Sequence, residues 1–258
     1  MLSAVIITLN EAQNIARCLQ SLAGVADEII VLDSYSTDDT LPICAAFANA
    51  RLVQAEWQGY STSKNYANGL ATYDMILSLD ADEELSPELK KSILEYKKSY
   101  LNNKNSTAKT AECSRLTSYC GAWVRHGGWY PDRKIRIFNR TQLEWRGAVH
   151  ETLEPIGAAR PTTVRLQGDL LHHSFHTHEA LVKQLDKYAS IAAQTRYDKG
   201  ERGSYLKIIY KTVFKFFRNY ILKLGFLDGK LGVIIAFWTA KETYWRYYRL
   251  LLLQKNGN

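Results

Sequence analysis

The sequence predicts an α/β protein that begins as a parallel sheet and ends in a helical appendage. Three observations lead to this prediction. Strand-like and helix-like segments alternate through about the first 80 residues, as they do in parallel sheets with crossover helices. Successive β segments then replace the alternation. The last 54 residues have helical periodicity and many basic and aromatic side chains.

Four strands are predicted in the alternating part of the chain. Leu2–Thr8 is rich in β-branched residues, and Met75–Leu79 is an apolar run typical of a strand buried in a parallel sheet. The predicted strands cover residues 2–8, 28–33, 51–54 and 74–79, and the helices between them cover residues 11–23, 40–48 and 63–71. Asn10 is placed to cap the first of these helices, and Gly24 is placed to end it.

The second half of the chain mixes strands with longer helices. Ser86 followed by Pro87 predicts the start of a helix that runs to about residue 100. The predicted β segments cover residues 112–123, 134–139, 144–150 and 161–172, and the later helices cover residues 178–199, 205–224 and 229–253. We therefore expect a sheet domain over residues 1–200 and a tail over residues 201–258.

Composition excludes several classes of protein. The apolar content of 46% is ordinary for a globular protein with a core. The four cysteines have neither CxxC nor zinc-site spacing and are interpreted as reduced thiols of a cytosolic protein. The sequence contains no GxGxxG and no GxxxxGK[ST] motif, which argues against a dinucleotide fold of the usual kind and against a P-loop. We expect no signal peptide and no transmembrane helix.

The positive charge of the chain lies in its tail. From Tyr205 onward there are ten Lys and Arg residues and two acidic residues, so the tail accounts for the whole net charge of +7. Basic helices rich in Trp, Tyr and Phe suit an anionic membrane surface. The alternative is a helical hairpin that packs on the core or on a second subunit. Nucleic acid is not an expected partner, because the other face of these helices is too apolar to follow phosphates.

The strongest chemical signal is the run that ends in Asp80, Ala81 and Asp82. In an open α/β sheet, acids at the carboxyl end of a strand face a ligand. If the chain stays extended there, the two carboxylates project to one side and the small Ala81 points away. Paired carboxylates suit Mg²⁺ or Mn²⁺ shared with substrate phosphates. The alternative is a solvated acidic turn before the next helix.

Several motifs together resemble family 2 glycosyltransferases of GT-A (Rossmann-like) fold. They are Thr8-Leu-Asn-Glu11, Val31-Leu-Asp-Ser-Tyr-Ser-Thr-Asp38 and Leu79-Asp-Ala-Asp-Glu83, in this order and spacing. The later motifs resemble the branch that contains the lipopolysaccharide core β-1,4-glucosyltransferases, and they are Trp129-Tyr-Pro-Asp132, Arg136-Ile-Phe-Asn-Arg140, Val149-His-Glu151 and Gly225-Phe-Leu-Asp-Gly229. The resemblance implies a mixed sheet flanked by helices and a UDP-sugar donor.

The resemblance also implies which residues bind the nucleotide-sugar. Those near the first two strands are Thr8, Leu9, Asn10, Glu11 and Asp33, with Asp33 accepting the uracil N–H. Those near the metal strand are Lys64, Asn65, Asp80 and Ala81, and Asp82 is the implied metal ligand. Asp33 has helix capping as its alternative role, and Lys64 has that of a solvated helix lysine.

Sugar transfer with inversion needs a general base for the acceptor hydroxyl. Glu151 is our first candidate and Asp132 our second, and either acid has an alternative role as a structural partner of a nearby arginine. His172 lies at a predicted strand end, and the resemblance implies that it is a further metal ligand, whose imidazole favours Mn²⁺ over Mg²⁺. The alternative for His172 is an ordinary histidine without a ligand. Arg136, with Arg133, is expected to hold phosphate groups unless it is a strand-surface arginine.

Together these observations predict a metal-dependent inverting glycosyltransferase. The expected donor is UDP-glucose, and the expected acceptor is a lipid-linked glycan such as lipopolysaccharide inner core, on the inner face of the inner membrane. One alternative is an enzyme that glycosylates polyprenyl phosphate, whose acceptor needs no general base. A second alternative is a non-catalytic, membrane-associated sugar-binding protein, and the C-terminal helices are also candidates for a homo-oligomer contact.

Overall fold

A computed structural model describes residues 1–101, 110–147, 151–157 and 161–256. The chain forms two compact units. The first contains residues 1–115 and 132–172, and the second contains residues 116–131 and 173–258. The expected separation of a domain over residues 1–200 from a tail over residues 201–258 stays a prediction.

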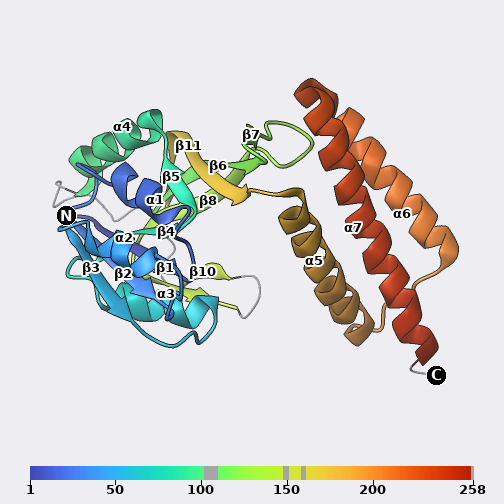
Figure 1. Ribbon diagram of the computed structural model, residues 1–258, viewed down its shortest axis with the longest axis horizontal. Helices are drawn as coiled ribbons and strands as arrows, with labels where there is room; N and C mark the ends of the chain where they lie inside the picture. Colours follow the sequence, from blue (N-terminus) through green and yellow to red (C-terminus); the bar gives the residue numbers. More distant parts are fainter. Residues whose placement is uncertain (102–109, 148–150, 158–160, 257–258) are drawn as a thin grey trace. The chain divides into compact units, whose positions relative to one another are not determined.

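The main sheet is mixed, as predicted, and it has nine strands (Figure 1). Its strands are β1 (Ser3–Thr8), β2 (Glu28–Asp33), β3 (Ala50–Gln54), β4 (Met75–Asp80), β5 (Glu83–Leu85), β6 (Thr110–Tyr119), β7 (Ala122–Trp123), β8 (Asp132–Asn139) and β11 (Thr163–Phe175). The order is β3-β2-β1-β4-β8-β6-β11-β5, with β7 paired to β6. The first four strands in this order are mutually parallel, whereas β8 is antiparallel to β4 and β11 is antiparallel to β5. A separate antiparallel pair consists of β9 (Leu143–Arg146) and β10 (Thr152–Pro155).

The helices of the first unit are mostly shorter than predicted. They are α1 (Ile15–Ser21), α2 (Thr40–Ala45), α3 (Tyr60–Gly69) and α4 (Pro87–Tyr96), which a π-helix (Lys97–Leu101) continues. The prediction that Asn10 caps the first helix is wrong, because the N-cap residue is Asn14. Asn10 instead has a left-handed φ of 56°, and its side-chain oxygen accepts a hydrogen bond from the amide of Thr37. The predicted cap at Ser86 is confirmed, since its hydroxyl accepts a hydrogen bond from the amide of Leu89 at 3.2 Å.

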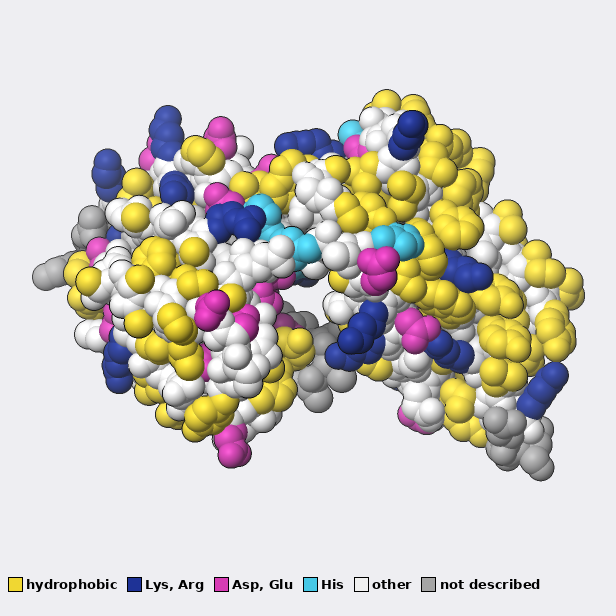
Figure 2. Space-filling view, viewed as in Figure 1, with side chains coloured by type: hydrophobic (Ala, Val, Ile, Leu, Met, Phe, Trp, Pro, Cys, Tyr) yellow, Lys and Arg dark blue, Asp and Glu magenta, His cyan; other side chains and the backbone are white. Residues whose placement is uncertain are grey.

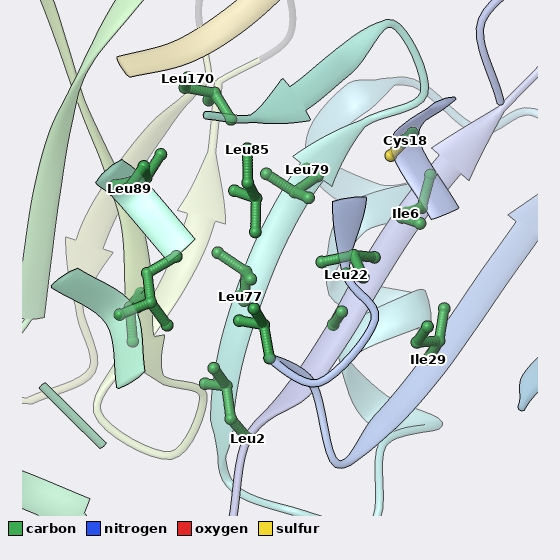
Figure 3. Close-up of a cluster of buried hydrophobic side chains, with 14 of the residues drawn as sticks. Leu2, Ile6, Cys18, Leu22, Ile29, Leu77, Leu79, Leu85, Leu89 and Leu170 are labelled. Atoms are coloured by element: carbon green, nitrogen blue, oxygen red, sulfur yellow. The ribbon is translucent and has the colours of Figure 1, made fainter. Parts of the chain in front are cut away.

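Side chains of the parallel strands alternate between two apolar clusters. Ala4 and Ile6 belong to a cluster with residues of α1 and α4, including Leu89, and with Leu22, the residue that follows α1 (Figure 3). Val5 and Ile7 belong to the other cluster, with residues of α3 and β9. Each fully buried Leu or Ile contributes about 1.5–3 kcal/mol relative to an exposed one. The central strands are apolar on both faces because each face is buried against one of these clusters. The same packing holds the carboxyl ends of the strands in fixed register.

The second unit is built mainly from helices. They are α5 (His178–Asp198), α6 (Tyr205–Phe217), a π-helix η2 (Arg218–Leu222), a 3₁₀-helix η3 (Gly225–Asp228) and α7 (Gly229–Asn256). Helix α7 packs along both α5 and α6 (Figure 1). Ile208 of α6 is buried in one cluster with Tyr247 and Leu250 of α7. Over the part of the chain that the structure describes, no helix is both long enough and apolar enough to cross a membrane.

Candidate active site

The parallel register brings two predicted site strands to the same edge of the sheet. Asp33 at the end of β2 lies opposite Thr8, and Asp80 at the end of β4 lies opposite Ile7. Asp33 is fully buried, and its carboxylate accepts hydrogen bonds from the amide of Ser36 at 2.9 Å and from Gln54 Nε2 at 3.2 Å. Among the described residues, no hydrogen bond or ion pair joins Asp33 to Asp80 or Asp82. Asp33 therefore shares the sheet edge with these acids but not their contacts.

The segment after β1 is fastened to the loop after β2. The backbone amide of Asn10 donates a hydrogen bond to Ser36 Oγ at 2.8 Å, and Asn10 Oδ1 accepts one from the backbone amide of Thr37 at 2.8 Å. The amide of Glu11 donates to Thr40 Oγ1 at 2.8 Å. The other two residues of the predicted nucleotide-sugar segment differ in exposure, since Leu9 is exposed and Thr8 is buried. The Thr8 hydroxyl has no hydrogen-bond partner within the described structure.

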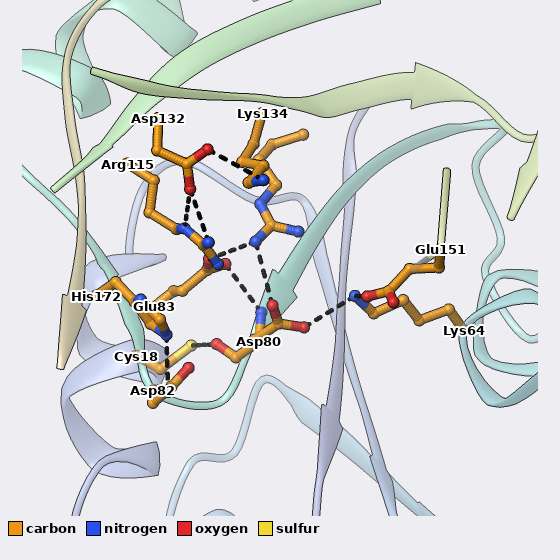
Figure 4. Close-up of polar contacts among 11 residues, drawn as sticks. Cys18, Lys64, Asp80, Asp82, Glu83, Arg115, Asp132, Lys134, Glu151 and His172 are labelled. Carbon is orange, nitrogen blue, oxygen red and sulfur yellow. Dashed lines mark hydrogen bonds and ion pairs between the residues drawn. The ribbon is translucent and has the colours of Figure 1, made fainter. Parts of the chain in front are cut away.

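A buried lysine joins the first metal-strand acid to the first candidate base. Lys64 of α3 is only 2% exposed, and its Nζ lies 3.0 Å from Asp80 Oδ1 and 3.2 Å from Glu151 Oε1 (Figure 4). The same ammonium group lies 4.8 Å from the centroid of the Trp145 ring. Two carboxylates and an aromatic ring thus compensate a buried charge that would otherwise be very costly. Lys64 is not a solvated helix lysine, which was the alternative.

The electrostatics of Asp80 follow from two buried cations. Burial raises the pKa of Asp80, but Lys64 and Arg136 outweigh burial and hold this pKa well below its usual range. Arg136 is 4% exposed, and its Nη2 lies 3.1 Å from Asp80 Oδ2. Asp80 is therefore a carboxylate at all physiological pH values. Arg136 is a buried partner of acids, not a strand-surface arginine.

Glu83 completes this network and was not singled out by the sequence. It is fully buried, forms an ion pair with Arg136 and accepts the amide hydrogen of Asp80 at 3.1 Å. Burial raises the pKa of Glu83, and Arg136 opposes that rise. Arg115 lies 3.7 Å from Glu83 and continues the network to Asp132. The signal in the sequence was the position of Glu83 directly after the acidic motif, but its burial depends on β5, a three-residue strand that was not predicted.

The second candidate base is held by two cations. Asp132 Oδ2 accepts hydrogen bonds from Arg115 Nε at 3.0 Å and Nη2 at 2.7 Å, and Asp132 Oδ1 lies 3.1 Å from Lys134 Nζ. The alternative role as partner of an arginine is found for Asp132, which pairs with Arg115 and also with Lys134, whereas Glu151 pairs with Lys64. The two residues before Glu151 in its motif, 149 and 150, lie outside the described residues.

Asp82 and His172 meet although they are 90 positions apart in the chain. β11 pairs with β5 so that His172 lies opposite Glu83, and His172 Nε2 lies 3.1 Å from Asp82 Oδ2. The expectation that Asp80 and Asp82 project to one side of an extended strand is wrong, because β4 ends at Asp80 and a turn begins at Ala81. Asp80 faces the cations and Asp82 faces the histidine (Figure 4). Ala81 is buried in the core.

The donor set at Asp82 fits a divalent metal ion. A carboxylate beside an imidazole suits Mn²⁺, with the remaining positions left to phosphate oxygens and water. Within the described residues, no group of three or more His, Cys, Asp and Glu side chains is placed to hold a metal ion. Burial raises the pKa of the nearby Glu11. A hydrogen bond to Asn14 opposes this rise, and the negative charge of Asp82 adds to it. Within the described residues, Asp82 and His172 are the pair that fits the predicted metal role, and that role stays a prediction.

Asn65 positions the strand that precedes Glu151. Its side-chain nitrogen donates to the carbonyl of Trp145 at 2.8 Å, and its side-chain oxygen accepts the amide hydrogen of Trp145 at 2.9 Å. Both polar atoms of Asn65 are thereby engaged with the backbone of β9. The predicted contact of Asn65 with the donor stays a prediction, whereas its link between α3 and β9 was not foreseen.

A hollow of about 200 Å³ lies at the carboxyl ends of β2 and β3 beside α3. It is lined by Leu32, Ala55, Glu56, Gln58, Ser63 and Tyr66. None of these is a predicted site residue, and the volume is small for a drug-sized ligand, whose pockets measure about 300–1,000 Å³. The polar network around Asp80, not this hollow, is therefore the centre of the candidate site.

Comparisons with known proteins agree with the resemblance seen in the motifs. The family model described as "Glycosyl transferase family 2" matches residues 3–103. A Rickettsia felis protein named as an uncharacterized glycosyltransferase is 30% identical over 99% of this chain and 92% of its own length. The lipopolysaccharide core biosynthesis glycosyltransferase LpsC of Rhizobium meliloti is 27% identical over 95% of this chain and 93% of its own length.

Among solved structures, Staphylococcus aureus TarS 1–349 in complex with UDP aligns with a TM-score of 0.48 at 15% identity, covering 100% of this chain and 92% of TarS 1–349. The sequence relatives are what assign the family, because one of them is similar over almost the full length of both chains. The chain belongs to glycosyltransferase family 2 and is a glycosyltransferase, and its sheet is mixed, as the resemblance implies.

Proposed function

We propose that the protein is an inverting, divalent-metal-dependent glycosyltransferase that uses a UDP-sugar, with UDP-glucose as the first candidate. The acceptor we propose is a lipid-linked glycan such as the inner core of lipopolysaccharide, reached from the inner face of the inner membrane. The name of the Rhizobium meliloti relative supports this acceptor class. The observation that carries the proposal is the meeting of Asp82 with His172 beside the network of Asp80, Lys64 and Glu151.

In this proposal Asp82 and His172 hold the metal ion, which neutralises charge on the departing diphosphate when it is bound. Thr8–Glu11 and Asp33 form the nucleotide side of the site. Asp80, which stays ionised because of its two cations, accepts hydrogen bonds from sugar or ribose hydroxyls. Arg136 keeps Asp80 in place, since its guanidinium group also pairs with the buried Glu83.

Glu151 is the proposed general base. Lys64 Nζ lies 3.2 Å from Oε1 of the Glu151 carboxylate and thereby fixes the direction of this carboxylate. A carboxylate fixed in this way is suited to accept the proton of an acceptor hydroxyl. Asp132 is the weaker candidate, because three hydrogen bonds and ion-pair contacts from Arg115 and Lys134 already surround its two oxygens.

The test is UDP release by the purified protein, with Mn²⁺, from a panel of nucleotide sugars in the presence of lipid-linked acceptors. We expect Asp82→Ala to lower the transfer rate by at least about 100-fold, as for loss of a group that stabilises transition-state charge. Asp74→Ala is the matched control, because Asp74 precedes the other end of β4 and pairs with Arg140 at an exposed position. Full transfer activity in Asp82→Ala would refute the proposal.

A second pair of variants separates the two classes of acceptor. Glu151→Gln combined with Asp132→Asn removes both candidate bases. Transfer to a glycan hydroxyl should then fall by about 100-fold or more. A phosphate acceptor needs no such base, so undiminished transfer in the double variant would favour a polyprenyl-phosphate glycosyltransferase instead.

A further inference from the structure

Helix α6 turns its apolar face away from the protein. The residues of this outer face are Leu206, Ile209, Tyr210, Val213, Phe214 and Phe217, and their side chains are between 44% and 82% exposed. Residues 206, 210, 213 and 217 follow the spacing of one helical stripe. In a soluble domain the apolar stripe of a helix normally faces the core. In α6 the apolar stripe faces outward instead.

The side of α6 that packs along α7 carries much of its charge. Ile208 is buried there, and Lys207 and Lys215 are half-buried. Lys207 Nζ lies 2.5 Å from Glu201 Oε1 and 5.4 Å from the ring centroid of Tyr247. Burial lowers the pKa of Lys215, and the nearby Arg218 lowers it further. The lysine stems thus fill the contact with α7, which leaves the outer face of α6 free for another partner.

The exposed apolar surface continues after α6. Leu222, Phe226 and Leu227 are each more than 40% exposed. Figure 2 shows hydrophobic side chains gathered over the helices of this unit, with Lys and Arg side chains among them. A patch of this kind on a soluble protein marks an interaction site.

The charge along this surface is mainly positive, and Glu201 pairs with Lys207 on the side of α6 that packs along α7. Between residues 204 and 240 the sequence contains six Lys and Arg residues and one acidic residue, Asp228. The Asp228 carboxylate is turned to the loop before Trp129, where it accepts the amide hydrogens of Arg125 and His126 at 3.0 and 2.8 Å and contacts His126 Nδ1 at 2.6 Å. The cations Arg218, Lys223 and Lys230 are exposed. An occupant of the outer face therefore has to be apolar in its interior and negatively charged at its edge.

We propose that the outer face of α6 lies on an anionic lipid bilayer surface, with its apolar residues among the acyl chains and its cations at the phosphate level. Apolar side chains on one face and Lys and Arg residues around them are the features of interfacial helices. A second copy of this chain fits less well, because a two-fold contact through the same face would bring positive edges together. The inference rests on the proposed function, since a lipid-linked acceptor gives the surface its use.

The experiment is co-sedimentation of the full chain with vesicles of phosphatidylcholine, with and without phosphatidylglycerol. We expect binding to the anionic vesicles that weakens with salt. The test variant combines Ile209→Ser, Val213→Ser and Phe217→Ser, which changes only exposed positions. Its affinity for anionic vesicles should fall at least tenfold. The matched control combines Leu94→Ser, Tyr188→Ser and Leu252→Ser, which are exposed apolar positions on other helices, and should bind as the unaltered chain does.

A second variant addresses the charge. Arg218→Gln with Lys223→Gln should weaken binding about fivefold for each cation removed, since each contributes about 1 kcal/mol near an anionic surface. Failure of the unaltered chain to bind anionic vesicles, or equal binding by the triple-serine variant, would overturn the proposal. The proposal would also be overturned if light scattering showed a dimer of the unaltered chain and a monomer of the triple-serine variant.

Donor hydrolysis, measured as UDP release without lipid, separates this proposal from the proposed function. The triple-serine variant should keep the hydrolysis rate of the unaltered chain, because no outer-face residue belongs to the candidate active site. An unaltered chain that binds vesicles but releases no UDP from any nucleotide sugar would refute the proposed function and leave the membrane surface standing. An unaltered chain that releases UDP but does not bind anionic vesicles would refute the membrane proposal and leave the proposed function standing.

Discussion

Replacing Lys64 by Met removes the central charge of the candidate site and keeps most of the apolar stem. Asp80 and Glu151 then face each other without the ammonium group that lies 3.0 and 3.2 Å from them. Breaking a buried ion pair costs about 3–5 kcal/mol. The side chains of Asp80 and Glu151 are 29% and 23% exposed, so water relieves part of the repulsion. We therefore expect a loss near the lower end, about 3 kcal/mol in the free energy of unfolding.

The assay is a double-mutant cycle followed by chemical denaturation. Its members are Lys64→Met, Glu151→Gln and the combination of the two. Glu151→Gln removes one of the two facing carboxylates, so the combined variant should lose at least about 1 kcal/mol less than the sum of the single losses. Lys91→Met on the exposed side of α4 is the control and should lie within about 0.5 kcal/mol of the unaltered chain. Additive losses within about 0.5 kcal/mol would refute the coupling of Lys64 to Glu151.

Three further predictions follow from single contacts. Glu83→Gln should destabilise the protein by about 3 kcal/mol, because it removes the carboxylate from a fully buried ion pair. Urea denaturation measures this loss, and a change below about 0.5 kcal/mol would contradict the prediction. Burial raises the pKa of Asp27, but Lys97 and a backbone amide outweigh burial and lower it. Asp27 therefore stabilises the fold above its unfolded pKa of about 3.9, and this contribution is lost as the pH falls through the lower folded value. The difference in unfolding free energy between Asp27→Asn and the unaltered chain should shrink over that interval, and a constant difference from pH 7 to pH 2 would argue against it. Gly168→Ala should cost about 2 kcal/mol or more in thermal unfolding, since φ is +87° and a Cβ would overlap the backbone of α4, whereas Gly69→Ala in open space should be neutral or stabilising.

Periodicity and strand-end chemistry predicted the parallel half of the sheet and placed the acidic residues at its edge. This worked because buried parallel strands are apolar on both faces, and because their carboxyl ends share one edge. The shared metal role of Asp82 and His172, which the family resemblance implies, stays a prediction, although the two side chains do meet. The sequence did not predict their contact from spacing, since that contact depends on long-range antiparallel pairing.

The missed features have the same physical origin. β5 has three residues and no periodicity of its own, so neither its pairing with β11 nor the burial of Glu83 is visible in the sequence. The turn at Ala81 separates Asp80 from Asp82, whereas two-residue spacing favours a common direction only in an extended chain. The partners of Lys64 and Asp132 depend on which strands become neighbours, and local sequence does not contain that information.

The pairing of β5 with β11 also fixes the order in which the site comes into existence during synthesis. A ribosome has already made both aspartates of the Asp80–Asp82 motif when it reaches residue 85, yet the strand that supplies the imidazole is completed about 90 residues later. At about 5–20 residues per second, several seconds separate the two events. A nascent chain in that interval has β5 without its partner strand, and Asp82 meets His172 only when β11 has been made.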